Sequence, residues 1–336
     1  MANGRKINSS PARKERIAIA GAGIAGAYLY RLLRKQGHAV EIFDRHPGTK
    51  CGLRPCAWGT TREFVELVKD AGLNPETYVL RTFDYLLMED RKVRADVMTL
   101  HKPKLIQDLL QGALIHYSPF QPADYDRIID ATGVARALLP ALPGDIIMPC
   151  IQYRIRTDAS LNNRVKLGGV GYAWCFPLED HEYHLGCGSL RAEPRKIMEE
   201  LGWIPDIPED DGGKMICACA STIRLTGPQL SQPFVSNGVW GIGEAIGCVA
   251  PLAGDGIIPG MRSVRILLDC WGNAEDYTAA ILDEFRWMEK ERVVVDKLMR
   301  EKPLGIRDAW ALKKNARRMG IELRLKEAGL FLKNLM

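Results

Sequence analysis

The sequence feature that most constrains the fold is a glycine-rich turn, Gly21-Ala-Gly-Ile-Ala-Gly26, that lies between an apolar run and an amphipathic segment. The apolar run at 16–20 predicts a short buried strand, and the amphipathic segment predicts a helix that stops at Gly37. Another apolar run at 39–43 predicts a second strand. A strand, turn, helix and strand in about 30 residues form a parallel βαβ unit, so the sequence predicts a Rossmann-type α/β domain.

The three glycines of this turn have separate roles in binding a dinucleotide. Gly21 permits the tight turn, Gly23 lets the backbone approach a pyrophosphate, and Gly26 allows the helix to pack closely on the strand. The first residues of the helix, Ile24 and Ala25, lie where free N–H groups can bind the phosphates. The sequence therefore predicts a dinucleotide site here, and a glycine-rich unit that binds no ligand is the alternative.

An acidic residue ends the second strand of this unit. Asp44 lies 18 residues after Gly26, at a position where a carboxylate can accept hydrogen bonds from ribose hydroxyl groups. Arg45 follows it directly in the chain. We therefore include Asp44 and Arg45 among the predicted cofactor-binding residues.

Three later segments indicate FAD rather than NAD. Asp130-Ala-Thr-Gly133 follows a buried apolar strand and resembles the A-T-G element of flavoproteins with two dinucleotide-binding motifs. The segment 240–247 resembles their G-D-A motif, in which an acid binds the flavin ribityl chain, with Glu244 in place of the usual aspartate. The segment 251–257 leads into a helix whose N-terminus can stabilise negative charge on reduced flavin. The resemblance implies these cofactor-binding residues: Ala131, Thr132, Gly133, Gly243, Glu244, Pro251, Gly254, Asp255, Gly256 and Ile257.

Two further segments resemble the geranylgeranyl reductase family. Tyr172-Ala-Trp-Cys-Phe-Pro177 resembles its Y-x-W-x-F-P signature, and Arg54-Pro-Cys56 resembles its P-C-G element, with Ala57 in place of the glycine. With the flavin motifs, the resemblance runs from about residue 16 to residue 268. It implies the fold of p-hydroxybenzoate hydroxylase relatives, FAD as cofactor with Arg54 and Pro55 near it, and reduction of carbon–carbon double bonds in a polyprenyl chain.

The aromatic signature could line the substrate pocket. Tyr172, Trp174 and Phe176 alternate along a predicted strand and therefore share one face, with Pro177 at the end of the strand. An isoprenoid chain requires an apolar, aromatic pocket with few polar groups. From periodicity alone, the same residues could instead belong to the core of the sheet.

Reduction of an isolated alkene requires hydride at one carbon and a proton at the other. Reduced FAD would supply the hydride, and Cys56, matched through the family resemblance, is the candidate proton donor. Cys51 is a nearby alternative that could pair with Cys56 under oxidation, and Cys56 could also be a structural thiol. We expect His181 and His184 to be exposed.

The order of predicted elements divides the chain into four regions. We expect a disordered leader (1–14), a discontinuous FAD-binding domain (15–60, 100–150 and 233–272), a substrate domain (61–99 and 151–232) and a C-terminal helical region (273–336). In the substrate domain, alternating segments predict an antiparallel sheet with strands at 151–156, 165–170, 173–177, 183–189 and 215–225 and a helix at 194–201.

The C-terminal region is basic. The 336-residue chain has a net charge of +5, and residues 303–336 alone carry eight basic and three acidic residues, interleaved with apolar ones. Such helices could lie on an anionic membrane surface or pack on the protein with a solvated basic face. Because no second G-x-G-x-x-G is present, we expect electrons from transiently bound NAD(P)H or from an acidic ferredoxin. No nucleic-acid partner is expected.

Composition indicates a soluble globular protein, with 46% hydrophobic and 26% charged residues. We expect no secretory signal, and no apolar run reaches the ~20 residues that a membrane span requires. Nine cysteines, mostly in apolar contexts, favour a reducing compartment. We expect a cytoplasmic protein, free or peripheral on the cytoplasmic face of a membrane. Cys217-Ala-Cys219 lacks a second ligand pair, so no metal site is expected.

Two other functions stay open at this point. One is a flavin-dependent monooxygenase of the same superfamily, which would use NAD(P)H and O₂; the segment 172–177 and Cys56 argue against it, because hydroxylases do not share that pair. The other is a non-catalytic family member that holds FAD or lipid. Ala57, Glu244 and the somewhat short chain keep that alternative open.

Overall fold

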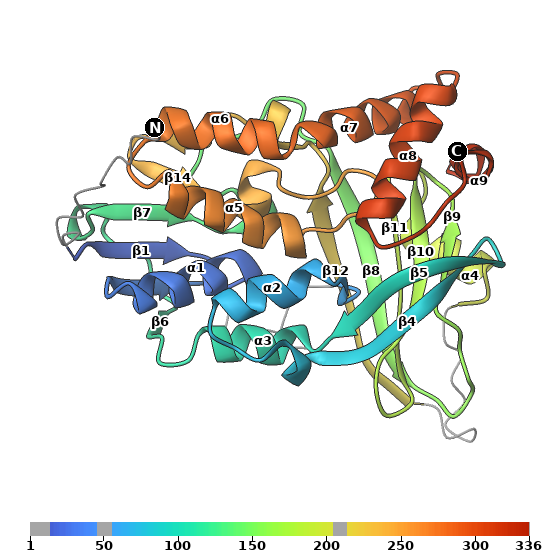
Figure 1. Ribbon diagram of the computed structural model, residues 1–336, viewed down its shortest axis with the longest axis horizontal. Coiled ribbons are helices and arrows are strands. Elements are labelled where there is room, and N and C mark those ends of the chain that lie inside the picture. The colour runs from blue at the N-terminus through green and yellow to red at the C-terminus, as the bar shows by residue number, and fades with distance from the viewer. Residues whose placement is uncertain (1–13, 46–55, 204–213, 336) are drawn as a thin grey trace, which may run out of the picture.

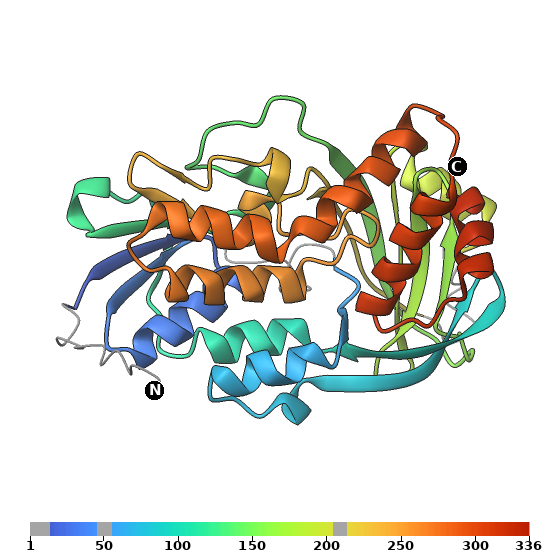
Figure 2. The same ribbon diagram turned by 45° about the horizontal axis from the view of Figure 1, so that its top comes forward.

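The computed structural model describes residues 14–45, 56–203 and 214–335. Figure 1 shows a parallel sheet with its helices on the left and a larger, curved sheet on the right. Helices from the last part of the chain run along the top and reach across the larger sheet (Figures 1 and 2). The predicted combination of a Rossmann-type sheet, an antiparallel sheet and a C-terminal helical segment is confirmed.

The first sheet has six strands in the order β13-β14-β7-β1-β2-β6. Neighbouring strands are parallel except for β13, which pairs antiparallel with β14. Its strands are β1 (Arg16–Ala20), β2 (Ala39–Phe43), β6 (Ile115–His116), β7 (Arg127–Asp130), β13 (Val235–Ser236) and β14 (Val239–Gly241). The predicted strands at 16–20 and 39–43 are therefore confirmed to the residue.

The second sheet has eight strands in the order β12-β8-β11-β10-β9-β4-β5-β3. All neighbours are antiparallel except β4 and β9. Its strands are β3 (Gly59–Thr61), β4 (Val79–Met88), β5 (Arg91–Leu100), β8 (Ile147–Arg156), β9 (Arg164–Leu167), β10 (Gly171–Pro177), β11 (Glu182–Ser189) and β12 (Lys214–Arg224). The structure confirms the predicted antiparallel sheet, although β8 begins earlier than expected and β9 ends at Leu167 instead of residue 170.

Helices α1 (Ile24–Lys35), α2 (Glu63–Asp70), α3 (Lys102–Leu109) and α5 (Ile257–Asp269) pack beside the parallel sheet. Fully buried side chains join them, among them Ile19 of β1, Leu29 of α1 and Val264 of α5. Short 3-10 turns connect these elements: η1 (Pro75–Thr77), η2 (Pro122–Asp124), η3 (Gly133–Ala135), η5 (Pro228–Leu230) and η6 (Gly243–Ile246).

The two faces of the larger sheet have different covers. Helix α4 (Pro194–Glu200) packs on one face, where Met198 is fully buried. Helices α8 (Ile306–Arg318) and α9 (Leu325–Asn334) cover the other face, where Leu312 and Phe331 are buried with Trp174. Helices α6 (Ala274–Glu284) and α7 (Arg286–Met299) lead from the parallel sheet to this cover. None of the helices in the described ranges is long and apolar enough to cross a bilayer.

A buried arginine at the end of β12 connects the two sheets. Arg224 is 3% exposed, and its Nε and Nη2 donate to the Asp145 carboxylate at 2.9–3.1 Å. Its Nη1 donates to the carbonyl oxygens of Gly133 (3.2 Å) and Glu244 (3.0 Å). These two carbonyls lie beyond the C-terminal ends of β7 and β14, so Arg224 holds the antiparallel sheet against the ligand-binding edge of the parallel one.

Replacing this arginine should destabilise the protein. Arg224→Leu would leave Asp145 without its buried partner, and breaking a buried ion pair costs about 3–5 kcal/mol. Arg94→Ala removes an exposed pair with Glu322 and should cost at most about 1 kcal/mol. Urea unfolding of the two variants and the parent measures the difference. Equal free energies of unfolding for the two variants would contradict this account.

Candidate functional site

One cavity of about 1390 Å³ runs between the two sheets. Its lining includes the glycine turn, the segments that follow β7 and β14, and the cavity-facing side of the larger sheet. The predicted site residues that line it are Gly21, Gly23, Ile24, Ala25, Asp44, Arg45, Cys56, Ala131, Thr132, Gly133, Tyr172, Trp174, Phe176, Gly243, Glu244, Gly254, Asp255, Gly256 and Ile257. Gly26, Pro177 and Pro251 do not line it, and Arg54 and Pro55 lie outside the described residues.

The glycine turn has the geometry that its sequence predicts. Gly21 has a φ of +109°, and a Cβ there would lie 2.2 Å from the carbonyl oxygen of Ala131. A Cβ on Gly26 would lie 2.0 Å from the carbonyl oxygen of Gly21. In contrast, a Cβ on Gly23 would have no heavy atom within 4 Å. Two glycines therefore permit close backbone packing, while the third leaves open space at the cavity wall.

This turn fits the diphosphate of a dinucleotide. No described side chain caps the N-terminus of α1, and its first turn contains no acidic residue, so the helix presents N–H groups and a partial positive charge to the cavity. Asp44 accepts hydrogen bonds from the N–H groups of Ala22 (2.8 Å) and Arg45 (2.7 Å). These bonds hold the carboxylate at the end of β2, beside the turn.

Glu244 uses its extra length to reach the second sheet. Its Oε1 accepts a hydrogen bond from the backbone N–H of Arg224 at 2.8 Å. Its Oε2 lies beside Gly133, where a Cβ would be 3.1 Å away. The Glu244 side chain therefore extends from the segment after β14 and contacts both the segment after β7 and strand β12. That it also binds the ribityl chain of FAD stays a prediction.

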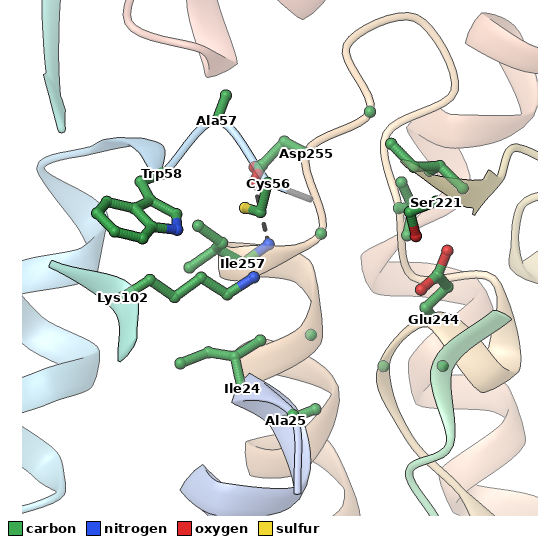
Figure 3. Close-up of a pocket in the computed structure, with 18 of the residues that line it drawn as sticks. Ile24, Ala25, Cys56, Ala57, Trp58, Lys102, Ser221, Glu244, Asp255 and Ile257 are labelled. Carbon is green, nitrogen blue, oxygen red and sulfur yellow. Dashed lines mark hydrogen bonds between the residues drawn. The ribbon is translucent and has the colours of Figure 1, made fainter. Parts of the chain in front are cut away.

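The loop before α5 encloses an acidic side chain. Asp255 Oδ1 accepts a hydrogen bond from the N–H of Ile257 at 3.0 Å, at the first residue of α5. Burial raises the pKa of Asp255 to about 6, although the Ile257 N–H and the charge of Lys102 favour the ionised form. Figure 3 shows Cys56, Asp255 and the end of the Lys102 side chain projecting toward the same part of the cavity. The structure thus places a buried carboxyl group at the start of α5, beside the Cys56 thiol.

Cys56 is a half-buried free thiol on the wall of the cavity. It packs against the core of the parallel domain. Cys56 lies in the same cavity as the predicted cofactor-binding residues, as the sequence analysis expected. Its role in proton transfer stays a prediction. Its predicted alternative, Cys51, lies outside the described residues.

The aromatic row of β10 faces the cavity. Tyr172, Trp174 and Phe176 all line it, and the rings of Tyr172 and Trp174 lie 5.7 Å apart. The Tyr172 hydroxyl donates to the carbonyl oxygen of Ala253, so β10 contacts the loop before α5. On β11, opposite Trp174, a Cβ on Gly186 would lie 2.2 Å from the indole ring. Only glycine therefore allows the ring to lie against the sheet, a role that sequence reasoning missed.

An apolar compartment extends from this row toward α8. Its walls come from β4, β5, β9, the loop before α5, and α8 with the residues that follow it. They are Phe83, Leu86, Met88, Val97, Val165, Leu167, Leu252, Leu312, Ala316, Met319, Ile321 and Leu323. The contribution of α8 was not predicted, because no local pattern indicates which distant surface a basic helix covers.

An aromatic cluster lines the opposite part of the cavity, beside the end of β2. Phe43 lies 4.8 Å from the ring of His116 and 4.8 Å from that of Phe120. Phe43, Phe120 and Tyr117 line the cavity next to Asp44. Such rings can bind the adenine of a dinucleotide by stacking. Sequence reasoning missed them, although the cluster of aromatic residues at 117–125 was a visible signal.

One histidine prediction is wrong. His181 is exposed as expected, but His184 is only 1% exposed. Its ring lies edge-on to Trp58 at 4.4 Å, and its Nδ1 is 3.4 Å from the carbonyl oxygen of Ala57. Burial lowers the pKa of His184 to about 3. It is therefore a neutral packing residue beneath the segment that carries Cys56.

The C-x-C pair forms part of β12. Cys217 and Cys219 lie opposite Arg154 and Gln152 of β8, so both project from one face, as expected. Cys217 is disulfide-bonded, whereas Cys219 is a free thiol. Within the ranges that the structure describes, no three His, Cys, Asp or Glu side chains form a group that could hold a metal ion.

Comparison with known proteins agrees with this geometry. Residues 19–54 match the model of the NAD(P)-binding Rossmann-like domain. An uncharacterized protein of Methanocaldococcus jannaschii is 23% identical over 304 residues, covering 75% of this chain and 81% of its own. The menaquinone reductase of Mycobacterium tuberculosis is 30% identical over 124 residues, covering 34% of this chain and 30% of its own. The match to the Rossmann-like domain supports a dinucleotide cofactor.

Solved structures show the same fold over nearly the whole chain. A geranylgeranyl bacteriochlorophyll reductase-like protein of Thermoplasma acidophilum has a TM-score of 0.69 and 17% identity, covering 96% of this chain and 99% of its own. The p-nitrophenol 4-monooxygenase of Pseudomonas putida has a TM-score of 0.61 and 13% identity, covering 96% and 97%. The chain therefore has the fold that reductase-like proteins and monooxygenases share.

The open space at Gly23 gives a direct test of the dinucleotide site. Gly23→Leu should lose most of the predicted FAD but keep its melting temperature without cofactor, because a Cβ there contacts nothing and φ is −72°. Gly329→Leu is the matched control, since a Cβ on this α9 glycine also has no atom within 4 Å. Flavin absorbance and thermal melts measure both. Parental flavin content in Gly23→Leu would refute the placement of the site.

Asp255 gives a test of the cavity's electrostatics. In the folded protein its carboxyl keeps a proton to a pH of about 6, whereas an unfolded aspartate loses it near a pH of about 4. As pH rises from about 4 to about 6, the free energy of unfolding of the parent should therefore fall relative to that of Asp255→Asn. Urea unfolding of the cofactor-free proteins across this range measures the difference. A stability difference that does not change with pH would contradict the burial of Asp255.

Proposed function

We propose that the protein is an FAD-dependent oxidoreductase that reduces carbon–carbon double bonds of a polyprenyl chain. The observation that carries this proposal is the single cavity that joins the glycine turn to the apolar compartment under α8. A cofactor at the turn and a long hydrocarbon in the compartment would share this space. An apolar pocket with few polar groups is what a hydrocarbon substrate requires.

The chain's own residues would position the cofactor from several sides. The N–H groups at the start of α1 would bind the diphosphate, and Asp44 would accept hydrogen bonds from the ribose. Glu244, held by the Arg224 N–H, would contact the ribityl chain. When bound and reduced, FAD supplies the hydride. The start of α5 offers partial positive charge on its side of the cavity.

The second carbon of the alkene needs a proton. Cys56 is the proposed donor because it is a free thiol on the same cavity wall as the aromatic row. Asp255, which projects toward the same part of the cavity (Figure 3), holds a proton at pH values below about 6 and could resupply it. Tyr172 fixes the loop that carries Asp255 by its bond to Ala253, so it acts as a positioning residue. The aromatic rings exclude water from the reacting alkene.

The electron donor is proposed to be NAD(P)H or a reduced ferredoxin. A chemical reductant can replace either donor, so the prenyl reduction can be tested before the donor is identified. Dithionite-reduced protein should add pairs of hydrogen atoms to a geranylgeranyl lipid dispersed in detergent. Mass spectrometry of the extracted lipid measures the gain.

Filling the compartment should slow this reaction. Met319→Trp places a large ring on the α8 wall and should lower prenyl reduction roughly tenfold or more, while flavin content stays parental. Lys314→Trp, on the exposed side of the same helix, should reduce the lipid at the parental rate. Mass spectrometry and flavin absorbance measure the two effects.

Two results would reject the proposed reaction. One is no gain of hydrogen on any of several polyprenyl lipids, although FAD is bound and reduced. The other is a product heavier by one oxygen atom, formed with NAD(P)H and O₂, which would show a monooxygenase.

A further inference from the structure

Helix α8 forms a wall one helix thick between the apolar compartment and solvent. Its inner side lines the cavity through Leu312, Asn315 and Ala316, together with Met319 just after the helix. Asn315 is held in place by the buried Glu291 of α7, to which its Nδ2 donates at 3.0 Å. An α-helix with its side chains is only about 10–12 Å across. Whatever contacts the outer side of α8 therefore lies close to the compartment.

The outer side of α8 combines cations with exposed apolar side chains. Ile306 is 68% exposed and Trp310 is 45% exposed. The basic residues of this side are Arg307, Lys313, Lys314 and Arg317. In the part of the chain that the structure describes, none of these four forms an ion pair; Lys313 lies 5.1 Å from the ring centroid of Trp310.

The acidic residue of α8 is absent from this side. Asp308 is 4% exposed and accepts hydrogen bonds from Lys297 at 2.8 Å and from the N–H of Gly305 at 2.7 Å. At 3.6 residues per turn, the six outer residues fall within about a third of the helix circumference, opposite the cavity-lining ones. The outer face is thus purely cationic and apolar.

This combination favours one kind of partner. An acidic protein or a free phosphate would need the cations but not an exposed indole and isoleucine between them. A bilayer interface uses both, because Trp and aliphatic side chains enter the headgroup boundary while Lys and Arg bind anionic lipids. The compartment behind the helix is itself apolar.

We infer that α8 docks the protein on an anionic phospholipid surface, with Ile306 and Trp310 in the headgroup region and the inner side of the helix facing the compartment that takes the lipid chain. The identity of the chain that enters rests on the proposed function, whereas the docking itself does not. The helix would place the bilayer about one helix diameter from the compartment.

Vesicle co-sedimentation with the full, FAD-loaded protein tests this inference. The parent should bind vesicles of phosphatidylcholine with phosphatidylglycerol, bind phosphatidylcholine alone much more weakly, and detach as salt is added. The triple variant Arg307→Glu, Lys314→Glu, Arg317→Glu should lose affinity for anionic vesicles by about a hundredfold or more, since each basic residue near the surface contributes about fivefold.

A second triple variant is the control for charge. Arg81→Glu, Arg91→Glu, Lys196→Glu makes the same change in net charge at exposed positions on β4, β5 and α4. It should bind vesicles with an affinity close to that of the parent. Trp310→Ala, which keeps every charge, should also weaken binding, because the apolar contact with the interface is lost.

Three outcomes would overturn the docking inference. The first is equal vesicle binding by the two triple variants. The second is equal binding of the parent to neutral and anionic vesicles. The third is an α8 variant that still binds vesicles like the parent but no longer binds an acidic ferredoxin. Reduction of a detergent-dispersed prenyl lipid, which the α8 variant should retain, separates the two proposals. If the parent docks through α8 but reduces no prenyl lipid, the docking stands and the proposed function fails.

Discussion

The buried guanidinium of Arg224 joins the two sheets, and the cavity between them depends on this contact. It binds Asp145 and the carbonyl oxygens of Gly133 and Glu244. Those carbonyls lie beyond the C-terminal ends of parallel strands, the edge at which ligands bind in open α/β sheets. One residue of the antiparallel sheet therefore ties the predicted substrate side to the predicted cofactor side.

The cavity also depends on glycines, which leave space for a ligand or allow close packing around it. Gly21 and Gly26 allow the backbone around the first strand and helix to pack closely, while Gly23 leaves free space at the cavity wall. Across the cavity, Gly186 lets the Trp174 ring lie close against the sheet. The same cavity thus has a polar end at the glycine turn and an apolar wall at β10, which the proposed function assigns to the cofactor and to a hydrocarbon chain.

Local signals predicted much of the fold. Strands at 16–20 and 39–43 and the intervening helix follow from glycine chemistry and apolar periodicity within a few turns of chain, and the structure confirms them. The burial of His184, the bridging role of Arg224 and the position of α8 over the compartment depend on residues far apart in sequence. Such contacts leave no local pattern. The sequence therefore indicated the cofactor-binding residues at the glycine turn, but not the wall that α8 forms along the apolar compartment.

The central claim is that FAD and a polyprenyl chain share one cavity, and the ligands that copurify with the protein test it most directly. Mass spectrometry of the solvent extract of freshly purified protein would identify both. The account predicts FAD together with an isoprenoid lipid, and loss of the isoprenoid alone when the compartment is filled by a large side chain. A nicotinamide dinucleotide in place of FAD, or an isoprenoid that stays bound after the compartment is filled, would contradict it.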